Sequence, residues 1–266
     1  MTQIGELAMV GALDEASDDK CPFCYKKRHD FASRKKKATA KVTSKPNQLA
    51  CAKLAVKGSW SHTTAKHHLI SAIQCYAKVR RLVRMASMVN YDINDPPNGI
   101  GLPTVANNIV YTVGGVGPQK FGKFAEPEKR NIAFSVMTQA KAQWHVGHHA
   151  FDIDIPPDWA DEEDGDIRGH TVSYDESVIK KLLKIMDAWV EAEICAEEDD
   201  KSSTLKADMD ALSKLIKDKL EMFAQDMPRS SAPFYVSRLS FDFAGEADKK
   251  RDLDDDDQPP KRKAKR

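Results

Sequence analysis

Apolar residues recur at helical spacing in several parts of the chain. Apolar side chains every three or four positions predict amphipathic helices in four stretches: 69–89, 128–149, 178–190 and 203–223. A shorter stretch, 47–56, has a similar pattern. By contrast, residues 234–243 alternate polar and apolar side chains, which predicts a strand. Together these elements predict an α+β fold that is mostly helical.

The segments between these elements contain residues typical of turns and loops. Residues 92–102 are rich in Asp, Asn, Pro and Gly and predict a loop. The glycines of 114–118 predict a flexible excursion, and they lack the Gly-Lys-Ser/Thr ending of a phosphate-binding loop. Residues 1–19 are predicted to be a loose leader. Residues 245–266 are charged and nearly free of apolar side chains, which predicts disorder.

Histidine has an uneven distribution along the chain. Five of the eight histidines lie in two clusters, His67-His68 and 145–149, with Asn98 in a turn between them. Imidazole titrates near neutrality, so it serves as a general base or as a neutral metal ligand. His145 and His149 are four residues apart, so on a helix they would share a face and chelate one ion. This set suits a single-metal phosphodiesterase, whereas the alternative interpretation is ordinary core and surface histidines beside a turn.

Short motifs follow one another along the chain in a fixed order. They are Lys66-His67-His68-Leu69-Ile70, Tyr91-Asp92-Ile93-Asn94-Asp95, Asn98-Gly99-Ile100-Gly101-Leu102-Pro103, His145-x-Gly-x-His149 and Tyr174-Asp175-x-x-Val178. This series resembles the AHH branch of the HNH/endonuclease VII nuclease superfamily, which is common as toxin domains of bacterial polymorphic toxins and type VI secretion effectors. The resemblance covers roughly residues 58–195, and several ordered motifs are more specific than a single His-x-x-x-His.

The resemblance implies a metal-dependent endonuclease with a small ββα-metal (His-Me finger) centre and with DNA as the favoured substrate. It makes His67, His145 and His149 the metal ligands, His68 the general base, and Asn98 the residue that orients His68. The cation would be magnesium or zinc, with nickel, cobalt and manganese as alternatives. As a toxin, the protein would also require a cognate immunity protein and a secretion machinery. It would be cytoplasmic in the producer and act in the cytoplasm of a target cell after type VI export.

Three departures from the family pattern shape these expectations. Lys66 replaces the usual Ala before the histidine pair, a change that suits a neighbouring phosphate. An acidic stretch, 151–173, separates the histidines from the Tyr174 motif, so the role of Tyr174 stays open. The spacing from His68 to Asn98 is long for a minimal hairpin, which predicts an extra helix within the motif.

Charge is segregated along a chain whose net charge is only +1. Residues 20–84 contain 17 Lys and Arg against one acid, whereas residues 151–200 contain 17 Asp and Glu against four Lys and Arg. Arg80, Arg81 and Arg84 follow the histidine pair closely, and a basic surface there would contact nucleic-acid phosphates. For residues 34–45, which include the basic run at 34–37, a solvated lysine-rich linker is an equally good interpretation. The basic tail, 261–266, either binds nucleic acid or keeps the chain soluble.

The five cysteines, at positions 21, 24, 51, 75 and 195, give an odd count without a signal sequence, which argues against a disulfide framework. Cys21-Pro22-Phe23-Cys24 has the spacing of a zinc knuckle. His29 and Cys51 are the best available completion of a structural zinc site. The alternative is a set of buried or half-exposed thiols.

Apolar stretches are too short for a membrane helix, and residues 1–20 lack the basic start and apolar run of a signal peptide. Two alternatives to a DNase stay open. One is an RNase of the same fold, and the other is a non-catalytic nucleic-acid-binding module with a structural zinc that has four protein ligands. The predicted organisation is a basic N-terminal segment with the C-x-x-C (1–57), a nuclease domain (58–195), a C-terminal helical extension with a short strand (196–244) and a disordered tail (245–266).

Overall fold

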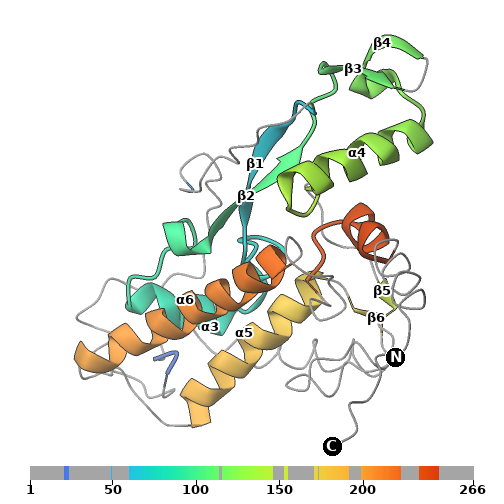
Figure 1. Cartoon of the computed structure of the whole chain (residues 1–266). Helices are drawn as coiled ribbons and strands as arrows, with labels where there is room; N and C mark the ends of the chain where they lie inside the picture. Colours follow the sequence, from blue (N-terminus) through green and yellow to red (C-terminus); the bar gives the residue numbers. More distant parts are fainter. Residues whose placement is uncertain are drawn as a thin grey trace, which may run out of the picture.

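The computed structural model describes residues 21–23, 49, 60–113, 116–145, 153–154, 171–172, 174–191, 199–222 and 234–245. Helices outweigh small antiparallel sheets (Figure 1), in agreement with the predicted α+β class. The longer helices are α3 (Arg80–Met88), α4 (Glu126–Ala140), α5 (Tyr174–Glu191) and α6 (Asp199–Met222). The strands form the pairs β1 (Thr63–His68) with β2 (Gly99–Thr104), β3 (Val110–Val113) with β4 (Val116–Lys120), and β5 (Ile153–Asp154) with β6 (Thr171–Val172).

The β1–β2 pair organises the centre of the molecule. The strands are antiparallel, in register from Thr63 opposite Thr104 to His68 opposite Gly99. Residues 69–98 connect them and contain the 3-10 turn η1 (Tyr76–Lys78), α3, and the 3-10 turn η2 (Pro96–Asn98). The extra helix expected between the histidine pair and Asn98 is therefore present.

One hydrophobic core lies between α3, α5 and α6, which pack side by side (Figure 1). The spacing of apolar residues in 178–190 and 203–223 predicted α5 and α6 correctly. Burial of a Leu, Met or Ile side chain contributes about 1.5–3 kcal/mol, so this three-helix contact supplies much of the folding free energy. Its fully buried members include Leu82, Met85, Leu182, Leu205, Met209 and Ile216.

A second core lies where the β3–β4 ribbon and the 3-10 turn η3 (Phe121–Lys123) pack on α4. The segment 234–245 joins the two cores. Phe234 and Val236 belong to the first core, whereas Tyr235 and Ala244 belong to the second. This segment therefore couples the helical bundle to the α4 region.

Two predicted helices are shorter than their sequence patterns suggested. Residues 69–89 form α3 only from Arg80 onward, because both the backbone N–H and the carbonyl of Ile70 bond to the side chain of Asn98. The helix predicted over 128–149 ends at Ala140, because Lys141 adopts the left-handed conformation with φ 48°. Trp144 and His145 therefore lie outside the helix, contrary to the prediction.

The strand predicted over 234–243 is also wrong, since residues 238–245 are helical. The hydroxyl of Ser237 accepts a hydrogen bond from the backbone N–H of Ser240 at 3.2 Å, which is the geometry of a helix N-cap. Arg238 and Asp242, four residues apart, pair along the same segment. Local capping thus outweighs the alternating pattern.

Several predictions lie outside the described residues. These are the leader 1–19, the tail 246–266 and, apart from the buried Leu49, the helix at 47–56. In the part of the chain that the structure describes, no helix has both the length and the apolar content that crossing a bilayer needs.

Candidate active site

The last two residues of β1 present their imidazoles to different surroundings. Successive side chains of a strand point to opposite faces, so His67 and His68 diverge. His67 is buried, with 3% of its surface exposed, whereas His68 is half-buried. The two adjacent imidazoles therefore differ in burial and lie on opposite sides of β1.

His67 meets His145, although the two residues lie far apart in the sequence. Their ring centroids are 5.3 Å apart with an interplanar angle of 70°. His145 reaches this position because its backbone N–H donates to the carbonyl of Pro103, in β2, at 2.9 Å. The β1–β2 pair therefore positions both imidazoles.

The C-terminal segment fixes the residues just before His145. The Gln143 side chain donates to the carbonyl of Phe234 at 3.0 Å and accepts from the backbone N–H of Val236 at 2.9 Å. The N–H of Trp144 donates to the hydroxyl of Ser240 at 2.9 Å. His145 is thus held in a non-helical segment by long-range hydrogen bonds, and the argument that placed it on a helix face with His149 does not hold at residue 145. His148 and His149 lie outside the described residues.

Tyr174 contacts His67 from the start of α5. Its hydroxyl donates to the carbonyl of Leu69 at 2.7 Å and lies 3.2 Å from Nε2 of His67. Burial raises the pKa of Tyr174 well above its ordinary value, so the phenol stays neutral and keeps its proton. That proton goes to Leu69, so the hydroxyl accepts from Nε2–H of His67 and the lone pair of this imidazole resides on Nδ1. The Tyr174-Asp175-x-x-Val178 motif thus brings a site residue whose role the sequence left open.

His68 contacts Asn94 in the loop before η2. Nε2 of His68 lies 3.2 Å from Oδ1 of Asn94. Burial lowers the pKa of His68 from the ordinary 6.5, and this effect exceeds the opposing influences of the Asn94 hydrogen bond and the Asp92 charge. The imidazole of His68 is therefore neutral near pH 7, as a general base requires.

Asn98 is not the residue that orients His68, contrary to the prediction. Its Oδ1 accepts from the backbone N–H of Ile70 at 2.7 Å and from the Ser213 hydroxyl at 3.1 Å. Its Nδ2 donates to the carbonyls of Ile70 at 3.0 Å and of Ile93 at 2.9 Å. Asn98 therefore ties the end of β1, the 92–94 loop and α6 together, while Asn94 takes the place beside the imidazole.

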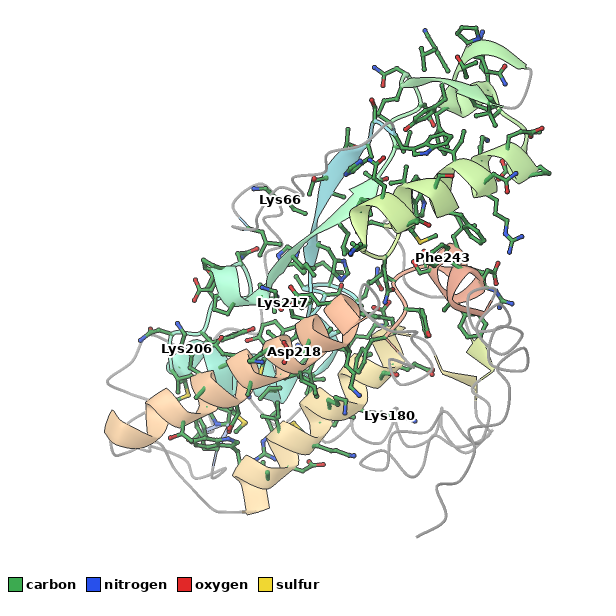
Figure 2. The ribbon with its side chains drawn as sticks, in the orientation of Figure 1. Lys66, Lys180, Lys206, Lys217, Asp218 and Phe243 are labelled. Carbon is green, nitrogen blue, oxygen red and sulfur yellow. The ribbon has the colours of Figure 1, made fainter. Side chains whose placement is uncertain are left out.

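The predicted phosphate-binding arginines do not share one exposed face. Arg81 is buried, with Nε donating to the Pro22 carbonyl at 2.7 Å and Nη2 to the Phe23 carbonyl at 3.2 Å. Arg84 is also buried, with 5% of its surface exposed. Arg80 is exposed on α3, and Lys66 is exposed on β1, where Figure 2 labels it. The prediction for Arg81 and Arg84 is therefore wrong, because α3 is enclosed by α5, α6 and residues 21–23.

The predicted zinc knuckle falls mostly outside the described residues. Cys21 is buried, whereas Cys24, His29 and Cys51 lie among residues that the structure does not describe. The contact of Arg81 with the Pro22 and Phe23 carbonyls anchors this segment on α3.

Two imidazoles, His67 and His145, are the described donors that fit a divalent cation. Their ring centroids lie 5.3 Å apart, and the Tyr174 hydroxyl gives His67 an outer hydrogen bond of the kind that metal-binding histidines commonly have. Among the described residues, no group of three His, Cys, Asp or Glu side chains comes together. A third protein ligand would have to come from another segment, such as the one that carries His149.

Comparisons with protein-family models, with curated proteins and with solved structures found no match to this chain.

Proposed function

We propose that the protein is a metal-dependent phosphodiesterase that cleaves nucleic acid, with DNA as the favoured substrate. The main support comes from His67 and His68 at the end of β1, whose imidazoles point in different directions. His67 faces a second imidazole, His145, while the adjacent His68 faces a carboxamide. These different surroundings support a ligand role for His67 and proton transfer by His68. The motif resemblance supports the same division of roles.

His67 and His145 would hold the cation, with His149 as a third ligand suggested by the motif alone. A bound cation would neutralise charge on the scissile phosphate and stabilise the leaving 3′-oxygen. Tyr174 contacts Nε2 of His67 and would restrain the ring, so that Nδ1 would be the nitrogen that binds the metal. That these residues form a ββα-metal nuclease centre is part of the proposal.

His68 would accept the proton of the water that attacks phosphorus. Its lowered pKa keeps the imidazole neutral at the start of the reaction, and the contact with Asn94 limits rotation of the ring. A positioned general base contributes about 10²–10⁴-fold to a rate. Lys66 and Arg80, both exposed, are the candidates for contact with substrate phosphates.

The biological setting rests on the resemblance. An antibacterial toxin of this kind would be exported by a dedicated machine and neutralised in its producer by an immunity protein. RNA is the alternative substrate, because nothing in the site residues reads or excludes a 2′-hydroxyl.

The test is incubation of the purified protein with supercoiled plasmid and with total RNA, with and without EDTA. We expect nicked and then linear plasmid, and no cleavage after chelation or in His68→Ala. If RNA is degraded and plasmid is not, the substrate is RNA and not DNA. Cleavage that persists in both EDTA and His68→Ala would reject the proposed site.

A further inference from the structure

We propose that Asp92 is a positioning residue for His68 and acts through the side chain of Asn94. The inference rests on the proposed function, in which His68 is the general base. Oδ1 of Asp92 accepts two hydrogen bonds from Asn94, one from the backbone N–H at 2.9 Å and one from Nδ2 at 2.8 Å. The carboxylate therefore holds both the backbone and the side chain of Asn94.

These contacts decide which end of the Asn94 carboxamide faces His68. A carboxylate is only an acceptor, so Asp92 requires the NH₂ end of Asn94. The oxygen of the same amide is then directed at Nε2 of His68, at 3.2 Å. An amide oxygen is also only an acceptor, so Nε2 must carry the proton of the neutral ring. The lone pair consequently resides on Nδ1, which becomes the atom that accepts a proton from water.

Without Asp92 the carboxamide would lose this preference. Rotation of the amide by half a turn would place Nδ2 beside His68 and favour the opposite tautomer, with the proton on Nδ1. The two orientations of an unrestrained Asn side chain have similar shape, so sterics alone would not choose between them. A single carboxylate that does not hydrogen-bond to His68 in this structure thereby determines which nitrogen is basic.

The structure also predicts that Asp92 can be removed without unfolding the loop. The Asp92 side chain is exposed, whereas the backbone of the loop is anchored independently, because the carbonyl of Ile93 accepts from Nδ2 of Asn98. The buried side chain of Ile93 anchors the same loop in the first core. Loss of Asp92 should therefore affect the side chain of Asn94 more than the fold.

The direct readout is the tautomer of His68 in the metal-free full-length protein. Long-range ¹H–¹⁵N correlation spectra of histidine-labelled protein distinguish Nε2–H from Nδ1–H, and His68→Gln assigns the signal. We expect Nε2–H in the unmodified protein and a mixture of both tautomers in Asp92→Ala. Asp92→Asn retains an acceptor oxygen and should restore most of the Nε2–H form. Asp95→Ala is the matched control, because it removes an equal charge from the same loop, and the Asp95 carboxylate pairs with Lys206 of α6 at 3.2 Å.

Kinetics provide the second readout. In Asp92→Ala, kcat should fall about 10- to 100-fold with little change in KM, less than the ~10²–10⁴-fold that loss of the base costs. Asp95→Ala should keep both the tautomer and kcat. The proposal is overturned if Asp92→Ala retains pure Nε2–H with normal kcat, or if Asp95→Ala produces the same changes. A tautomer shift in a protein that cleaves no nucleic acid would uphold the positioning and reject only the nuclease function.

Discussion

Truncation of the two asparagines near the histidine pair should have different effects: loss of Asn98 should reduce stability, whereas loss of Asn94 should reduce activity. The side chain of Asn98 is 1% exposed and makes four hydrogen bonds, to the N–H and the carbonyl of Ile70, the carbonyl of Ile93 and the hydroxyl of Ser213. Asn98→Ala removes all four and leaves buried backbone groups unsatisfied. At about 1 kcal/mol for each bond, and more for an orphaned group, the loss should be roughly 3–5 kcal/mol.

A loss of this size is large beside the ~5–15 kcal/mol by which a typical domain is stable. It should lower the urea midpoint at an unchanged slope and lower Tm by about 10 °C. Asn94→Ala is the matched comparison. Asn94 is half-buried and contacts His68, so its truncation should cost little stability and should reduce kcat.

The assay measures urea unfolding and initial cleavage rates on the same two variants. The reasoning predicts that Asn98→Ala loses stability and that Asn94→Ala loses activity at near-normal stability. An Asn98→Ala protein with the unmodified urea midpoint and no activity would refute it, because Asn98 would then act on His68 as the motif resemblance implied.

Three further predictions concern the histidines and the charged residues. Tyr174→Phe removes the hydroxyl beside His67 and should weaken metal binding about 10- to 100-fold in calorimetry; unchanged affinity would show that this hydroxyl does not orient the ligand. Because burial lowers the pKa of His68, kcat/KM should rise with pH through a midpoint below 6.5 and then level off, whereas a midpoint above 7 would exclude His68 as the base. Arg80→Ala should flatten the salt dependence of DNA binding by about 0.9 in log–log slope, while Arg81→Ala should lower Tm and leave that slope unchanged.

The longer helices were predictable because their signal is local. The apolar spacing that predicts α5 and α6 depends on residues within a few turns, and those same residues fill the first core. The helix before His145 was predicted too long. Lys141 ends α4 by adopting the left-handed conformation, and no Gly or Pro at this point of the sequence signals the end of a helix.

The sequence singled out the histidine pair and His145, which contacts His67, but not Asn94, which contacts His68. Asn94 and Asn98 both lie in a loop with turn-forming residues, and spacing alone cannot say which carboxamide reaches His68. The fold of residues 69–98 decides this, because it brings the Asn98 side chain into hydrogen-bond contact with the backbone of Ile70 and with α6. The Asp92-x-Asn94 pattern is a local signal that could have drawn attention to Asn94.

Burial of Arg81 and Arg84 was unpredictable for a related reason. Arg81 and Arg84 are separated only by Leu82 and Val83, and a basic helix that follows candidate catalytic histidines in the sequence resembles a binding surface. Only the tertiary structure places residues 21–23 against that helix, where the Pro22 and Phe23 carbonyls accept from Arg81.

We propose that His67 and His145 bind the catalytic metal while His68 performs the proton transfer. Both roles can be measured by titrating metal-stripped protein with a divalent cation and following bound metal and plasmid cleavage in the same samples. We expect His67→Ala and His145→Ala to lose both binding and cleavage, and His68→Ala to lose cleavage alone. Equal loss of metal in His67→Ala and His68→Ala, or full metal binding in His145→Ala, would rule out these assignments.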